Sequence, residues 1–122
     1  MFKDRKTTGA VGEKQAEKFL KKQGYKIIET NYRCKLGEID IVARDKDTIV
    51  FAEVRTKHNL EYGTPEESVN SAKQAKLIKL AEYYMQQHQG TAQFWRIDVV
   101  AVEMGERDKI SRIEIIKNAV AD

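Results

Sequence analysis

The feature that most constrains the fold is a pair of strand-like runs within residues 37–57, GEIDIVARDKDTIVFAEVRTK. Apolar and polar residues alternate in each run, and a short charged turn joins them, which predicts an antiparallel β-hairpin. A two-residue loop at Lys46 and Asp47 sets the register by pairing Asp45 with Thr48. In this register one face is wholly apolar, and its residues are Ile39, Ile41, Ala43, Val50, Ala52 and Val54.

Two acids stand at the centres of these strands, where apolar residues are easier to accommodate. The register places Asp40 directly opposite Glu53, and because opposed residues have Cβ atoms about 4.5–5.5 Å apart, their like charges destabilise the sheet. A proton on one acid, a basic side chain between them or a bound divalent cation would each relieve the repulsion. Arg55 and Lys57 lie on the same strand face as Glu53, so a plain salt-bridge cluster is one of the open alternatives.

The segments before the hairpin predict a helix and a strand. Residues 7–23 place Gly12, Ala16, Phe19 and Leu20 on one side at helical spacing, and Gly24 marks the end. Glu13 falls at the edge of this apolar stripe, from which it can supply a third acid to the pair in the hairpin. Residues 25–33, YKIIETNYR, predict a strand.

The segments after the hairpin predict a second helix and two strands. Thr64 as N-cap, Pro65 in the first turn and Glu67 at capping-box spacing predict a helix over 64–89. Its core-facing residues are expected to be Val69, Ala72, Leu77, Leu80, Ala81 and Tyr84. Residues 94–104 predict a strand buried on both faces, and residues 110–120 a weaker last strand. The order α-β-β-β-α-β-β predicts an α/β fold with a mixed sheet flanked by helices.

Length and composition narrow the class of protein. The chain of 122 residues suits one domain over 1–122, and its composition of 41% hydrophobic and 34% charged residues is ordinary for a globular protein. No run approaches the roughly 20 apolar residues of a membrane span, and the single cysteine, Cys34, fits a reducing compartment, so we expect a cytoplasmic protein without a membrane partner. Residues 1–37 carry ten Lys or Arg against four acids, a net +6, which suits DNA but equally a solvated helix face.

Paired carboxylates are the usual ligands of Mg²⁺, and a cation between Asp40 and Glu53 beside Arg55 is a setting for phosphodiester hydrolysis. The motifs GEID and FAEVRTK, after a helix bearing Glu13, resemble those of the PD-(D/E)XK nuclease superfamily, which has a restriction-endonuclease-like fold. The whole chain is similar to the YraN-like family of bacterial proteins, which is related to archaeal Holliday junction resolvases. GAVGEKQAEKFLKKQGYKIIETNYR, GEIDIVARD, VFAEVRTK, GTPEESVNSAKQAKL and RIDVVAV follow one another in the order of that family.

The resemblance implies a role for each residue of the predicted site. Asp40, Glu53 and the backbone carbonyl of Val54 become ligands of Mg²⁺ or Mn²⁺, and Glu13 becomes an outer acid. Arg55 stands where the superfamily has lysine, and Lys57 follows it, the reverse of the usual order. This exchange keeps the positive charge and weakens any role as a base, because arginine does not lose its proton in proteins. The residues assigned to contacts with DNA are Arg33, Lys35, Lys57, Lys73 and Lys76.

Three functions follow from this reading. The leading one is a Mg²⁺-dependent endonuclease-like protein that hydrolyses DNA, with branched, Holliday junction-like DNA as a candidate substrate. The alternatives are a non-catalytic DNA-binding or scaffold module that keeps the nuclease fold, and a protein-interaction domain whose acids belong to a salt-bridge network. A resolvase-like role calls for a homodimer. Asp98 is expected to be structural and paired with Arg96, and His58 to be a solvated loop residue.

Overall fold

The chain folds in the predicted order of elements. The computed structural model describes the backbone of residues 5–120 and the side chains of residues 9–120. Of the basic N-terminal stretch, Lys3 and Asp4 and the side chains of Arg5 and Lys6 lie outside this description. The elements are α1 (Arg5–Lys22), β1 (Lys26–Cys34), β2 (Gly37–Asp45), β3 (Thr48–Lys57), the 3₁₀ turn η1 (Glu66–Ser68), α2 (Ser71–Gln87), β4 (Phe94–Met104), the 3₁₀ turn η2 (Glu106–Asp108) and β5 (Ile110–Val120).

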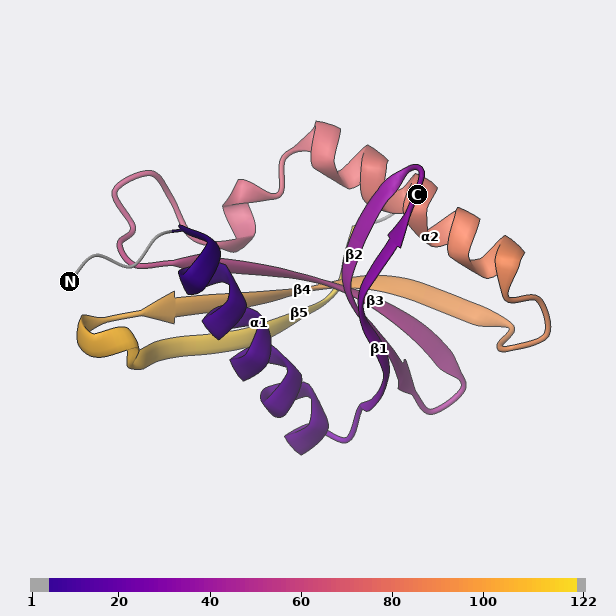
Figure 1. Cartoon of the computed structure of the whole chain (residues 1–122), viewed down its shortest axis with the longest axis horizontal. Coiled ribbons are helices and arrows are strands. Elements are labelled where there is room, and N and C mark those ends of the chain that lie inside the picture. The colour runs from indigo at the N-terminus through magenta and orange to yellow at the C-terminus, as the bar shows by residue number, and fades with distance from the viewer. Residues whose placement is uncertain (1–4, 121–122) are drawn as a thin grey trace.

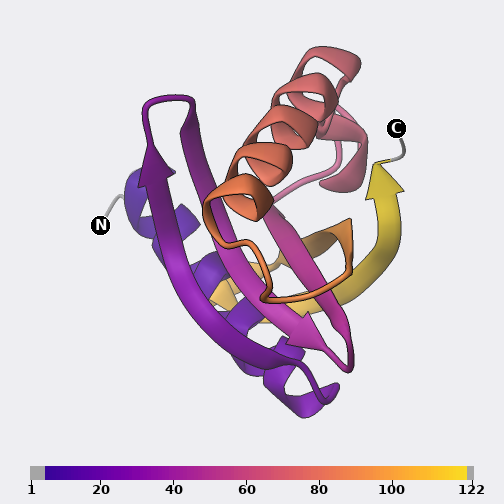
Figure 2. The ribbon, with the colours of Figure 1, turned by 90° about the vertical axis from the view of Figure 1, so that its right-hand side faces the viewer.

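The five strands form one mixed sheet in the order β1-β2-β3-β4-β5. Neighbouring strands are antiparallel except β3 and β4, which are parallel because η1 and α2 connect them across the sheet. Helices α1 and α2 lie on opposite sides of the sheet (Figure 1), and the view from the side shows α2 crossing one face while α1 lies behind the strands (Figure 2). The predicted mixed sheet flanked by helices is confirmed.

Each helix packs on its own hydrophobic core. Leu77, Leu80, Ala81 and Tyr84 of α2 are buried against a cluster that includes Phe51 of β3. Ala16 and Leu20 of α1 are buried on the other face, with alternate residues of the strands. Strand β4 is buried from Ile97 to Val102, as the sequence predicts for a strand covered on both faces. The edge strands β1 and β5 are more exposed and alternate.

The predicted hairpin register is correct from the turn as far as Ile41 and Ala52. The pairing of the two strands ends there, just before Asp40 and Glu53. Asp45 pairs with Thr48, and the register continues to Ile41 opposite Ala52. Asp40 and Glu53 are not a ladder pair, so their predicted position directly opposite one another is wrong in detail. Ile39 was expected beside Ile41 but is buried in the core under α2, whereas Ile41 faces α1. Strand β2 therefore changes its facing at Asp40.

The second helix begins later than predicted. Thr64 and Glu67 form the predicted capping box, because Glu67 N donates to Thr64 Oγ1 at 3.3 Å and Thr64 N donates to Glu67 Oε1 at 3.0 Å. This box caps only η1, since Val69 leaves helical geometry. Asn70 is the true N-cap of α2 and accepts from Lys73 N at 2.9 Å. Ala72, expected in the core, is exposed as a result.

Helix α1 comes unusually close to β3 at Gly12. A Cβ atom on Gly12 would lie 2.0 Å from Thr56 Oγ1, a distance that no folded protein tolerates without a shift. Glycine therefore lets the helix backbone rest on the strand, which brings the next residue, Glu13, to the edge of the sheet where β2 and β3 separate. Within residues 5–120, no helix is long and apolar enough to cross a membrane.

Candidate functional site

The site is built around a side chain that replaces backbone pairing. Val54 N donates a hydrogen bond of 2.8 Å to Asp40 Oδ2, just beyond the last ladder pair of β2 and β3. The carboxylate thus satisfies a strand N–H in the place of a carbonyl from the neighbouring strand. Asp40 lies between the strands and lines a hollow on each side of the sheet. Asp40, an acid at the centre of an otherwise apolar strand, therefore lies at the point where β2 and β3 separate.

Glu53 is the buried member of the predicted pair, with 5% of its surface exposed. Two cations contact the same oxygen: Arg55 Nη2 lies 3.2 Å from Glu53 Oε2, and Lys73 Nζ of α2 lies 3.3 Å from it. These two cations offset part of the cost of burying a carboxylate at this position. Arg55 was the predicted partner, and Lys73 was predicted only as a contact to DNA.

The proton affinities of Asp40 and Glu13 are raised. Burial raises the pKa of Asp40, and the negative charge of Glu53 raises it further, against the lowering effects of the Val54 N–H and of Lys73. Burial also raises the pKa of Glu13 to about 7, and the charges of Asp40 and Glu38 and a hydrogen bond with Asp40 contribute. Glu13, Asp40 and Glu53 therefore form a row of carboxyl groups in which Glu13 and Asp40 have a raised affinity for protons.

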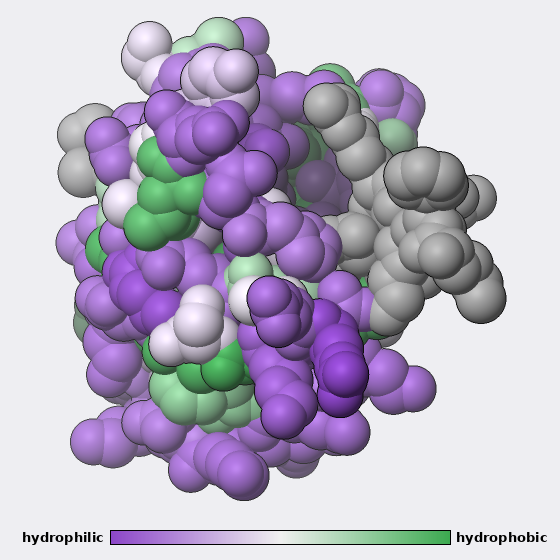
Figure 3. All heavy atoms as spheres, turned by 90° about the vertical axis from the view of Figure 1, so that its left-hand side faces the viewer, coloured by the Kyte–Doolittle hydropathy of each residue, from purple (hydrophilic) through white to green (hydrophobic). Residues whose placement is uncertain are grey.

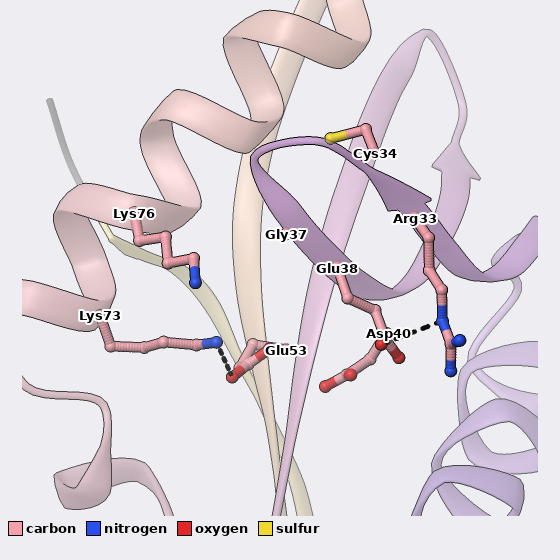
Figure 4. A pocket seen from close by; sticks show the side chains of 8 residues that line it. All are labelled: Arg33, Cys34, Gly37, Glu38, Asp40, Glu53, Lys73 and Lys76. Atoms are coloured by element: carbon pink, nitrogen blue, oxygen red, sulfur yellow. Dashed lines mark ion pairs between the residues drawn. The ribbon is translucent and has the colours of Figure 1, made fainter.

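A hollow of about 710 Å³ opens on the α2 side of this row. Figure 4 shows Lys73 and Lys76 reaching from α2 toward Glu53 and Asp40, while Arg33 approaches from β1. Arg33 Nε lies 3.3 Å from Glu38 Oε2. The remaining lining residues are Cys34 and Gly37. Three acids and three bases thus surround the hollow, with the acids at its floor and the lysines along the helix above.

The donor set at the row fits a hard divalent cation. Among the described residues, no three side chains of His, Cys, Asp or Glu converge as metal ligands. A site here therefore needs a backbone ligand beside Asp40 and Glu53, which is the role predicted for the Val54 carbonyl. Carboxylate oxygens are the donors that Mg²⁺ and Mn²⁺ prefer, so Asp40 and Glu53 have the chemistry of the predicted ligands.

The residues predicted to contact DNA divide into two groups. Arg33, Lys73 and Lys76 line the hollow above the acids. Lys35 is exposed at the turn between β1 and β2 and does not line the hollow. Lys57 lies at the far end of β3, where Lys57 Nζ donates to the carbonyl of Tyr62 at 3.4 Å. The structure therefore brings three of the five together at the site.

The contact between Lys73 and Glu53 was not predicted from the sequence, although the spacing of residues in α2 contains part of the information. Leu77 and Leu80 are buried under α2, and Lys73 and Lys76 each precede one of them by four residues, one helical turn. The two lysines must therefore project from the face of α2 that meets the sheet. Helical spacing alone could have placed them there, but not over Glu53, because that requires the crossing position of the helix.

Asp98 and His58 are two residues that the sequence analysis left outside the candidate site. Asp98 is fully buried and accepts from Arg96 Nε at 2.9 Å, from Tyr25 Oη at 3.0 Å and from Asn118 N at 2.9 Å. His58 is exposed in a loop after β3, where its Nε2 lies 3.1 Å from Asp108 Oδ1. Asp98 therefore belongs to a buried structural network, whereas His58 lines a hollow that also contains Glu13.

The fold and the site define a small α/β protein with a row of carboxyl groups at the opening of a hairpin, faced by basic side chains. The chain belongs to the uncharacterised protein family UPF0102, whose model matches residues 12–102. A UPF0102 protein of Caldicellulosiruptor saccharolyticus is 43% identical over 116 residues, covering 95% of this chain and 98% of the relative. One from Dehalococcoides mccartyi is 48% identical over 122 residues, covering 100% and 99%. The predicted YraN-like family is thereby confirmed.

One solved structure shares a limited likeness. It is SfsA of Pyrococcus furiosus in complex with Ca²⁺, which is 19% identical and has a TM-score of 0.39. The match covers 93% of this chain and 62% of that chain. A likeness at this level carries no conclusion about the site.

Proposed function

We propose that this protein is a metal-dependent endonuclease-like protein of the PD-(D/E)XK superfamily that hydrolyses phosphodiester bonds in DNA. The observation that carries the proposal is the row of Glu13, Asp40 and Glu53 at the place where β2 and β3 separate. Glu13 and Asp40 have raised pKa values beside a hollow with a basic rim, and carboxyl groups with perturbed pKa values cluster at functional sites.

The ion in this proposal is Mg²⁺ or Mn²⁺, held by Asp40, Glu53 and the carbonyl of Val54, with Glu13 as an outer acid. When bound, the ion supplies Lewis-acid activation of the phosphate and of the attacking water. The chain itself holds the ligands in place: the Val54 N–H fixes the Asp40 carboxylate, and Arg55 and Lys73 fix that of Glu53. Asp40 would have to lose its proton to act as a ligand, because metal ligands are deprotonated, and Glu13 would have to lose its proton to act as an outer acid.

Arg55 and Lys73 divide the work of the superfamily's lysine. Arg55 supplies a permanent positive charge for the scissile phosphate and cannot relay a proton. Lys73 brings an ammonium group to the same Glu53 oxygen from the neighbouring helix, 28% exposed to solvent. We assign to Lys73 the proton-transfer role that Arg55 cannot fill, because lysine side chains serve as proton donors and acceptors in enzymes and arginine side chains do not.

The basic rim serves contacts with the DNA backbone. Arg33 and Lys76 line the hollow above the acids and are placed to meet phosphates without reading sequence. The motifs resemble those of a family related to archaeal Holliday junction resolvases, and this resemblance makes branched, Holliday junction-like DNA the candidate substrate. Such a junction is two-fold symmetric, so this substrate would be cut by a homodimer.

A second candidate function rests on Arg55 itself. If Lys73 does not act in proton transfer, the site keeps metal and DNA without hydrolysis. The protein is then a non-catalytic DNA-binding or scaffold module on the same fold. Arg55 is the observation that favours this candidate, because its guanidinium keeps a fixed charge at all physiological pH values.

Cleavage of duplex, single-stranded and four-way-junction DNA in Mg²⁺ or Mn²⁺ tests the proposal. Wild type is expected to cut at least one substrate, and Glu53→Ala to lose the activity. Glu82→Ala, which removes an exposed acid of α2, is the matched control and is expected to leave the rate unchanged. Salt-dependent binding without cleavage by wild type supports the second candidate instead.

A further inference from the structure

A second hollow, of about 670 Å³, lies at the far end of β3, beside the acid row. It adjoins the row at Glu13 and Val54, and it also contains Arg55. The rest of its wall comes from the end of β3, the loop after it, α1 and η1, and these residues are Gly9, Thr56, Lys57, His58, Asn59, Tyr62 and Ser68. This end of the molecule faces the viewer in Figure 3, where the surface is mostly hydrophilic.

Tyr62 stands out on this wall because 87% of its surface is exposed. Aromatic side chains normally bury a large area, and those of the core here do so: Tyr84, for comparison, is 2% exposed. Leu60, two residues earlier, is 50% exposed. The ring of Tyr62 thus adds little to the stability of the fold.

The backbone around Tyr62 is nevertheless held in place. Its carbonyl accepts from Lys57 Nζ at 3.4 Å, and Gly63 N donates to the carbonyl of Leu60 at 3.1 Å. Glu61 N donates to Asn59 Oδ1 at 3.2 Å. The loop therefore presents the ring from a defined turn, which lowers the entropy lost when a ligand binds to it.

Lys57 brings a positive charge to the turn that carries Tyr62, because its Nζ donates to the Tyr62 carbonyl. The other basic groups of the hollow are paired: Arg55 Nη2 lies 3.2 Å from Glu53 Oε2, and His58 Nε2 lies 3.1 Å from Asp108 Oδ1. Arg55 Nε is buried and has no hydrogen-bond partner in the part of the chain that the structure describes. The Arg55 side chain as a whole is 31% exposed, so a phosphate in the hollow would meet the accessible part of its guanidinium rather than Nε.

We propose that this hollow binds an unpaired strand of nucleic acid, with a base stacked on Tyr62 and its phosphate facing Arg55 and Lys57. Exposed aromatic rings combined with cationic groups are how proteins bind single strands without reading sequence, because every base offers a face for stacking. Bases within a duplex already stack on each other, so only an unpaired strand can use the ring. The inference rests on the proposed function, since the strand continues from this hollow to the acid row.

Binding to a blunt duplex, and to the same duplex with a single-stranded tail, tests the inference by fluorescence anisotropy with Ca²⁺ in place of Mg²⁺. Loss of one stacked base corresponds to about tenfold weaker binding, so Tyr62→Ala should weaken binding of the tailed duplex by about that factor. It should leave the blunt duplex within about twofold, and Tyr62→Phe should bind like wild type. Phe94→Ala, which removes a 52% exposed ring at the opposite end of the β3–β4 pair, is the control and should change neither.

Each outcome of this experiment either supports the inference or contradicts it. If Tyr62→Ala weakens both DNAs equally or neither, the inference is wrong while the proposed function stands, and the exposed ring serves another kind of partner. If wild type neither binds nor cleaves any DNA, both fail together. Because the Tyr62 ring is almost wholly exposed, the variant should unfold at the wild-type temperature, and this control separates loss of stacking from loss of fold.

Discussion

Asp40 Oδ2 accepts a 2.8 Å hydrogen bond from Val54 N at the point where the pairing of β2 and β3 ends. The Asp40 carboxylate has two roles: it accepts a hydrogen bond from a strand N–H, and it places negative charge where the two strands separate. Substitutions of Asp40 can remove either role without the other.

The variant Asp40→Asn should keep the hydrogen bond with Val54 N and lose the negative charge. The amide oxygen can still accept from Val54 N, and the repulsion with Glu53 disappears, so stability at neutral pH should be equal to or above that of wild type. Asp40→Leu leaves the Val54 N–H without a partner and should cost about 1–3 kcal/mol. Chemical denaturation of both variants checks this; equal losses in the two would contradict the assigned hydrogen bond.

The raised pKa of Glu13 predicts a stability that falls as the pH rises. The folded protein holds a proton on Glu13 up to about pH 7, whereas the unfolded chain releases it near 4.5. Between these values the folded state binds more protons, so the free energy of unfolding decreases with pH and then levels off above 7. Glu13→Gln should flatten this decline in metal-free buffer. Melting temperatures of the two proteins across this range provide the measurement, and parallel curves would refute it.

Lys73 should set the proton affinity of Asp40. Its positive charge lowers the pKa of Asp40, so Lys73→Met should raise that pKa further. Lys76→Met removes a lysine that lines the same hollow and serves as the control, with a smaller expected shift. Titration of the Asp40 carboxyl carbon by NMR would show the difference. An unchanged pKa in Lys73→Met would mean that the lysine does not reach the site in solution.

Asp98 should behave as a structural acid. It is fully buried and accepts hydrogen bonds from three different residues. Removing one partner from a buried charged network typically costs about 3–5 kcal/mol, so Asp98→Ala should be strongly destabilised. At temperatures where the variant stays folded, its response to Mn²⁺ should equal that of wild type. A selective loss of that response would place Asp98 in the metal site.

Gly12 should tolerate no side chain. Because a Cβ there would lie 2.0 Å from Thr56 Oγ1, Gly12→Ala must displace the Thr56 side chain or push α1 away from β3, and it should cost about 1–3 kcal/mol. If α1 shifts, Glu13 moves with it, and the pH dependence of stability should weaken at the same time. Thr56→Ala in the same chain should recover part of the loss. Full stability of Gly12→Ala alone would contradict the close contact.

Much of the fold can be read from the sequence because it depends on local patterns. Alternation and turn length sufficed for the register near Lys46, and the helical spacing of Ala16 and Leu20 for the buried face of α1. The break at Val69 was not predicted, because Pro65 and the capping box signal a helix start but not how soon the helix ends. Asn70, a good N-cap, was the overlooked signal.

The sequence predicted which residues form the site, but it did not predict how they are arranged in space. Extending the hairpin register predicted Asp40 opposite Glu53, whereas the side chain of Asp40 itself ends the ladder. That outcome depends on a competition between a carboxylate and a backbone carbonyl for the Val54 N–H, and periodicity carries no information about it. The approach of Lys73 depends on how α2 crosses the sheet, which is likewise set by packing.

Calorimetric titration of Mn²⁺ into the metal-free protein tests the central claim most directly. The account predicts saturable binding to wild type, with proton release that grows as the pH falls below 7, and loss of binding in both Asp40→Asn and Glu53→Gln. Glu82→Gln, an exposed acid outside the row, should bind as wild type does. Absence of binding to wild type, or equal binding by the Asp40→Asn variant, would contradict the assignment of these carboxylates to a metal site.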